Sequence, residues 1–255
     1  ILKQYGSDAI QVQEETPTPP AIKQNYVPPK SEAEKLSERS AIVNQQIVNS
    51  GLGTQKAQVV TAINLSCSMA LSLKSGKVQE VLEKVLPMAM KFDDDGQIDV
   101  FLFHDEVFNH KTPFTLKNKQ NFILNEILFK YHLGEAFYAP VIKKITTKYA
   151  NAGKGADPAY ILFITDGFCD DSPQTEAAIK EASSKGVFWQ IIGIGDNKAG
   201  IEFLNKLDKM SGRTVDNVNY FHIDDLKKIN DQELYKRFLD EFSRWTKEAR
   251  QQGVI

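Results

Sequence analysis

Short apolar segments alternate along most of this chain with segments of helical periodicity, and this alternation limits the fold more than any other feature. The most apolar segment is Ala159–Thr165 (AYILFIT). The other strand-like segments are residues 57–64, 97–103, 187–194 and 220–223, with 107–108 as a short edge strand. A strand that is apolar on both faces needs cover on both, as when helices connect parallel strands. The sequence therefore predicts an α/β fold with a doubly wound, mostly parallel sheet and helices on both faces.

Helical periodicity fills the intervals between these strands. In Lys77–Phe92, apolar residues recur at three- and four-residue spacing, which is typical of a helix with one buried face. The other predicted helices are residues 31–50, 119–131, 139–150, 174–185, 201–210 and 231–250. No apolar run approaches the roughly 18 residues that span a bilayer, so we expect no membrane partner.

The first thirty residues differ from the rest of the chain. They contain five of its ten prolines, and proline lacks a backbone N–H and favours an extended chain. We therefore expect a proline-rich arm or linker over residues 1–30. An N-terminal helix is expected over residues 31–53, because Ser31 and Glu34 form a capping box. The main domain is expected over residues 54–255.

Charge and cysteine content exclude some classes of partner and location. The chain has 31 basic and 33 acidic residues, a formal charge of −2. Proteins that bind nucleic acid usually carry an excess of positive charge, so we expect no nucleic-acid partner. Two cysteines are too few for the disulfide framework of a small secreted domain, which favours a cytoplasmic location.

Polar residues follow two of the predicted strands, where ligands of open α/β sheets collect. Asn64, Ser66 and Ser68 follow the first strand at alternate positions, and alternate residues of an extended loop point the same way. Asp166 follows the most apolar strand, and a third polar loop covers residues 134–138. Oxygen-bearing side chains around one carboxylate suit a hard cation such as Mg²⁺.

These loops resemble the metal-ion-dependent adhesion site of von Willebrand factor A-type domains, which has an Asp-x-Ser-x-Ser loop and an Asp-Gly pair. Other segments resemble the von Willebrand A-type domain of bacterial tellurium-resistance proteins, namely 74–79 (KSGKVQ), 92–96 (FDDDG), 138–142 (YAPVI) and 220–225 (YFHIDD). The similarity covers roughly residues 40–250. It implies a von Willebrand A-like sheet of six strands, with a short antiparallel edge strand near Val107.

The chain departs from this family at the site itself. Asn64 replaces the family's first Asp, and Ala136 stands where the family's site has a Thr in its middle loop. Ser66, Ser68 and Asp166 are kept. The resemblance therefore implies a degenerate site that requires no cofactor and binds Mg²⁺ weakly or not at all. Glu135, beside the lost Thr, is the candidate for compensation. The alternative is a hydrogen-bonded polar crevice that holds water.

The resemblance implies a non-catalytic protein-interaction module of a tellurite- or stress-resistance system, with another protein as its partner. Two alternatives remain. One is a metal-assisted hydrolase that uses Asp166, although the sequence lacks a nucleophile elbow and an evident general base. The other is a degenerate domain with a purely structural role.

The two cysteines allow two interpretations. Cys67 lies within the Ser66–Ser68 loop and Cys169 lies three residues after Asp166, so neighbouring strands would place both thiols on the rim of one crevice. Such a rim could respond to oxidants or bind soft metals. The alternative is two separate buried thiols without reactivity, because reactivity requires exposure and a lowered pKa.

Overall fold

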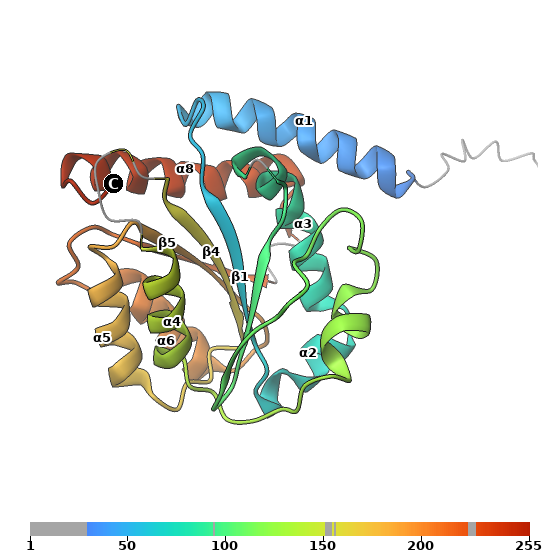
Figure 1. Ribbon diagram of the computed structural model, residues 1–255, viewed down its shortest axis with the longest axis vertical. Coiled ribbons are helices and arrows are strands. Elements are labelled where there is room, and N and C mark those ends of the chain that lie inside the picture. Colours follow the sequence, from blue (N-terminus) through green and yellow to red (C-terminus); the bar gives the residue numbers. More distant parts are fainter. Residues whose placement is uncertain (1–29, 94, 151–154, 156, 224–227) are drawn as a thin grey trace, which may run out of the picture. The chain divides into compact units, whose positions relative to one another are not determined.

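Six strands form one sheet in the order β3-β2-β1-β4-β5-β6, and only the β2–β3 pair is antiparallel (Figure 1). The strands are β1 (Gln58–Asn64), β2 (Asp99–Phe103), β3 (Val107–Asn109), β4 (Ala159–Thr165), β5 (Val187–Gly193) and β6 (Val218–His222). The predicted α/β fold is confirmed. The strand order reverses between β1 and β4, which is where ligand sites of open α/β sheets lie.

This computed structural model describes residues 30–93, 95–150, 155, 157–223 and 228–255. Glu32–Ile255 form one compact unit. The proline-rich arm expected over residues 1–30 falls almost entirely outside the described residues, as do Asp94, Asp224 and Asp225. No helix in the described part of the chain is both long and apolar enough to cross a membrane.

Helices cover both faces of the sheet, as predicted (Figure 1). They are α1 (Glu32–Ser50), α2 (Ala70–Lys74), α3 (Lys77–Phe92), α4 (Ala139–Tyr149), α5 (Ser172–Ala182), α6 (Lys198–Lys209) and α8 (Asp231–Gln251), with a short 3₁₀ turn η1 (Cys67–Met69). Ile161 and Phe163 of β4 enter the core beneath α4, α5 and α6. Tyr160 and Leu162 enter the core beneath α3 and α8. Ile161, Phe163 and Ile192 are all buried, as strands covered on both faces require.

The N-terminal helix α1 packs along α8 (Figure 1). Val43 is fully buried in the core that α3 and α8 share. Arg39 forms an ion pair of 2.8 Å with Asp231 at the start of α8, and the Ser243 hydroxyl donates to the carbonyl of Ser50 at 2.7 Å. The helix is therefore part of the same compact unit as the sheet.

The helix predicted over residues 119–131 is wrong, because this stretch is reduced to the six-residue π-helical segment η2 (Ile123–Leu128). The side chain of Gln79 on α3 explains the difference. Its Nε2 donates to the carbonyl of Lys119, and its Oε1 accepts the backbone N–H of Ile123 at 3.0 Å. In an α-helix these two backbone groups would bond to each other. Asn121, with a φ of 54°, turns the chain between them.

Candidate functional site

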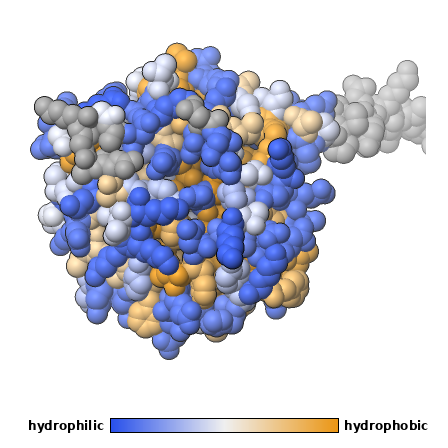
Figure 2. All heavy atoms as spheres, in the orientation of Figure 1, coloured by the Kyte–Doolittle hydropathy of each residue, from blue (hydrophilic) through white to orange (hydrophobic). Residues whose placement is uncertain are grey.

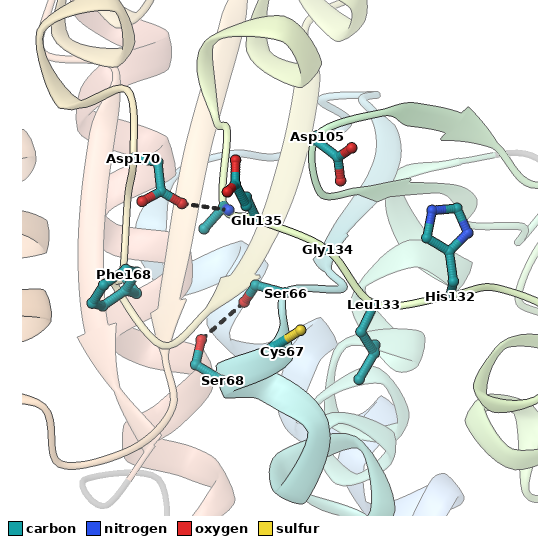
Figure 3. Close-up of a pocket in the computed structure, with 11 residues that line it drawn as sticks. Ser66, Cys67, Ser68, Asp105, His132, Leu133, Gly134, Glu135, Phe168 and Asp170 are labelled. Carbon is teal, nitrogen blue, oxygen red and sulfur yellow. Dashed lines mark hydrogen bonds between the residues drawn. The ribbon is translucent and has the colours of Figure 1, made fainter.

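An open pocket of about 840 Å³ lies beyond the carboxyl ends of β1, β2 and β4 (Figure 3). It therefore occupies the position where the strand order reverses. Its lining comes from the loop after β1 (Ser66, Cys67, Ser68), the loop after β2 (Asp105), the segment before α4 (His132, Leu133, Gly134, Glu135, Ala136) and the loop after β4 (Phe168, Asp170).

The loop after β1 is shaped by Asn64. This residue is fully buried, and its Oδ1 accepts the backbone N–H of Ser66 at 2.8 Å. The hydroxyls of Ser66 and Ser68 then meet at 3.0 Å on the pocket wall (Figure 3). The sequence predicted that all three side chains converge. The structure brings the two serines together in the lining and places Asn64 behind them.

A buried hydrogen-bond network joins this loop to the end of β4. The Nδ2 of Asn64 donates to Thr165 Oγ1 at 3.0 Å, and the backbone N–H of Gly167 donates to the same oxygen at 3.2 Å. These two bonds use both lone pairs of Thr165 Oγ1. The Thr165 hydroxyl can then only donate in its hydrogen bond with the Tyr138 hydroxyl. Complete burial raises the pKa of Tyr138 well above its ordinary value, so the phenol stays neutral.

Asp171 holds the segment before α4 against the loop after β4. Its carboxylate is 6% exposed and accepts the backbone N–H groups of Tyr138 and Ala139 at 2.8 and 2.9 Å. It also accepts the Thr175 hydroxyl at 2.9 Å. Because the first N–H groups of a helix have no partner within the helix, this carboxylate caps α4 from outside.

Asp170 makes a second, more exposed link between the same segments. Its Oδ2 accepts the backbone N–H of Ala136 at 2.8 Å, and its own N–H donates to the Ala136 carbonyl at 2.9 Å (Figure 3). Ala136 itself is buried and places no oxygen-bearing side chain in the pocket. The sequence did not identify Asp170, although an acidic residue just before a helix is a common start signal.

Among the described residues, no hydrogen bond joins the predicted metal ligands Asp166 and Glu135 to the serine pair. Asp166 is not part of the pocket lining, and its Oδ1 accepts the backbone N–H of Phe168 at 3.2 Å. The side chain of Glu135 is exposed and extends away from Ser66 and Ser68 (Figure 3). The position of Glu135 therefore does not support the expectation that it compensates for the Thr lost at Ala136.

Asp105 forms an acidic wall of the pocket that the sequence did not single out, although it follows the predicted strand 97–103. Its pKa lies below the ordinary value, chiefly because the carboxylate accepts its own backbone N–H and also contacts His104. Gly134 passes so close that an added Cβ would lie 2.1 Å from Asp105 Oδ1. Any other residue at position 134 would displace the side chain of Asp105.

The two cysteines differ in exposure and in their relation to the pocket. Cys67 is exposed and lines the pocket, whereas Cys169 is absent from the lining. Cys169 is partly buried, and its thiol donates to Asp171 Oδ1 at 3.3 Å. Burial raises the pKa of Cys169 to about 11. The interpretation of two buried thiols is therefore wrong for Cys67, and the raised pKa of Cys169 does not favour the redox rim, which stays a prediction.

We expect a thiol reagent at pH 8 to label Cys67 rapidly and Cys169 at least about a hundred times more slowly. With a pKa near 11, roughly one Cys169 thiol in a thousand is the reactive thiolate at this pH. Mass spectrometry of the folded protein, with Cys67→Ser and Cys169→Ser as single-thiol controls, measures both rates. Equal rates would show that the position found for Cys169 is wrong.

The family of von Willebrand factor A-type domains found at the C terminus of TerF matches residues 56–255. The uncharacterized protein YcbR of Bacillus subtilis (strain 168) is 38% identical over 202 residues, covering 78% of this chain and 81% of YcbR.

Two solved structures show the same fold. One is the conserved hypothetical protein BatB from Bacteroides thetaiotaomicron, with a TM-score of 0.52 and 16% identity over 75% of this chain and 99% of BatB. The other is proximal thread matrix protein 1 from the mussel byssus, with a zinc-occupied adhesion-site motif. Its TM-score is 0.50 and its identity 16%, over 73% of this chain and 48% of that one.

Proposed function

Because the chain belongs to the family of von Willebrand factor A-type domains found at the C terminus of TerF, we propose that it is a non-catalytic protein-interaction module of a tellurite- or stress-resistance system. The pocket at the reversal of strand order is the proposed binding surface. Another protein is the proposed partner, and the cytoplasm is the proposed location.

The position of Phe168 carries this proposal. Its side chain is 51% exposed on the wall of an open pocket whose surrounding loops are tied together by Asp170 and Asp171. A large apolar side chain exposed at a concave, well-anchored surface is typical of a protein-binding site. A non-catalytic role is supported by the polar groups. In the described part of the chain, no hydrogen bond joins Ser66, Ser68 or Cys67 to a histidine, the pairing that activates a nucleophile.

The charges of the lining favour a basic partner. Asp105, Glu135 and Asp170 line the pocket, and its described lining contains no Lys or Arg. Opposite charges across an interface speed association and exclude partners of the wrong charge. An arginine side chain suits this surface, because its planar guanidinium binds carboxylates and stacks on an aromatic ring such as that of Phe168.

Two pocket variants test the proposal. Phe168→Ala removes the aromatic wall, and Glu135→Lys reverses one charge, at positions whose side chains are exposed. We expect each to weaken capture of the partner by about tenfold or more, as for truncated or reversed residues at the centre of an interface. The captured proteins are quantified by mass spectrometry after pull-down with the immobilised chain, and the affinity of an identified partner is then measured by calorimetry.

Matched controls separate the pocket from general surface effects. Phe129→Ala removes an aromatic side chain that is 80% exposed just after η2, and Glu202→Lys reverses an exposed charge on α6. Both should bind as the unmodified protein does. Binding should also weaken as salt is added, since exposed charges are screened. Pocket variants that bind normally, or controls that bind as poorly, would refute the proposal.

A further inference from the structure

The family resemblance implies a divalent cation between the loops after β1 and β4, and the side chains present do not fit one. Mg²⁺ takes oxygen ligands, usually including one or two carboxylates. Ala136 supplies no oxygen, and Asn64 is neutral, with its Oδ1 already accepting the backbone N–H of Ser66. Asp166 is outside the pocket lining. Of the two carboxylates in the family's pattern, this chain keeps only Asp166, because Asn64 replaces the other.

We propose that the side-chain amide of Asn64 takes the place of a metal cross-link, so that the site is fully assembled without a cation. The amide bonds in two directions, accepting from the N–H of Ser66 at 2.8 Å and donating to Thr165 Oγ1 at 3.0 Å. It thereby joins the loop after β1 to the end of β4. This role is independent of what the pocket binds.

The neutrality of Asn64 is the decisive property. A carboxylate at this position could also accept the Ser66 N–H, and the Thr165 hydroxyl could turn its proton toward it. The geometry would survive, but an ionised group would then be buried at a position that is fully shielded from water. A buried charge is strongly unfavourable without a counter-charge. The groups bonded to the Asn64 side chain are uncharged, and the described pocket lining contains no Lys or Arg, so a bound metal ion is the counter-charge to test.

Thermal unfolding in EDTA and in millimolar Mg²⁺ or Mn²⁺ tests this role. The unmodified protein should have the same Tm in all three, within about 1 °C, and calorimetry should detect no micromolar binding of either metal. Asn64→Asp should lower the Tm in EDTA by roughly 6–15 °C. Asn109→Asp is the matched control, because it adds the same charge at an exposed position on β3 and should leave the Tm unchanged.

The double variant Asn64→Asp/Ala136→Thr restores the family's carboxylate and hydroxyl. We expect its Tm to be low in EDTA and to recover when Mg²⁺ or Mn²⁺ is added. Recovery would support the view that amide and metal are alternative cross-links. A metal-dependent Tm of the unmodified protein, micromolar metal binding by it, or a double variant that does not respond to metal would overturn the proposal.

Thr165 provides a second test that does not depend on Asn64→Asp folding. Thr165→Val removes the oxygen that accepts from Asn64 and from the Gly167 N–H, so it should lower the Tm by several degrees. Thr165→Ser keeps the oxygen and should retain most of the Tm. Equal effects of Val and Ser would refute the cross-link. Because no partner is involved, failure here would leave the binding proposal untouched.

Discussion

Replacing Asp171 with alanine should lower the free energy of unfolding by about 3–5 kcal/mol, one of the two largest effects expected in this chain. The carboxylate is 6% exposed and accepts the N–H groups of Tyr138 and Ala139 and the hydroxyl of Thr175. Its removal leaves these donors unpaired, and each buried unpaired donor costs about 1–3 kcal/mol. Part of this cost is recovered where water reaches the gap.

Urea unfolding followed by tryptophan fluorescence measures this change, because Trp189 and Trp245 are 0% and 2% exposed in the folded protein. Asp170→Ala is the matched comparison. Asp170 is exposed, and its side chain accepts the N–H of Ala136, so its replacement should cost about 1 kcal/mol. If Asp171→Ala costs no more than Asp170→Ala, Asp171 does not anchor the start of α4.

Truncating Phe163 to alanine should cost about 3–5 kcal/mol, the range for a buried phenylalanine whose removal leaves a cavity. Its ring is 2% exposed at the centre of β4. The ring centroid lies 4.9 Å from that of Phe103, 5.2 Å from Tyr138 and 6.2 Å from Trp189. Since Tyr138 also belongs to the hydrogen-bond network behind the pocket, the variant should weaken partner binding as well as folding.

The same unfolding experiment on Phe168→Ala provides the control for Phe163. This ring is 51% exposed, and its loss should change the free energy of unfolding by less than about 0.5 kcal/mol. The two phenylalanines therefore separate stability from binding. A cost below about 0.5 kcal/mol at Phe163 would mean that β4 is placed wrongly in the sheet.

The sheet could be predicted from the sequence because burial on both faces leaves a local signal. Ala159–Thr165 is apolar at every position before its final Thr, and β4 has these same limits. The helix over residues 119–131 could not be judged in this way. Its helical periodicity is overridden by Gln79, which lies 40 residues before Lys119 and takes up the carbonyl that an α-helix would use. A local pattern carries no information about such a distant amide.

The site could be predicted only in part. Ser66 and Ser68 were found because strand ends mark the pocket, and the same rule would have found Asp105 after β2. His132 enters the pocket because its segment crosses beside the loop after β1, where the backbone N–H of Cys67 donates to the Gly134 carbonyl at 3.0 Å. One of the two interpretations placed Cys169 at the rim, and the hydrogen bond from its thiol to Asp171 could not be predicted. Such contacts between loops leave no periodic trace in the sequence.

The pocket and the helices α1 and α8 lie at opposite ends of the strands, which matters when this chain is attached to a surface. Helices α1 and α8 lie near the end of the sheet where the strands begin (Figure 1). Arg250 of α8 bonds to Gln55 just before β1. The pocket lies at the other end of the strands. The length of the seven-residue strand β1, about 23 Å, separates the two ends. The space-filling view shows the mostly hydrophilic exterior on one side of the molecule (Figure 2). A linker on α1 would therefore hold the chain on an electrode or bead with the pocket facing the solution, as a receptor layer requires.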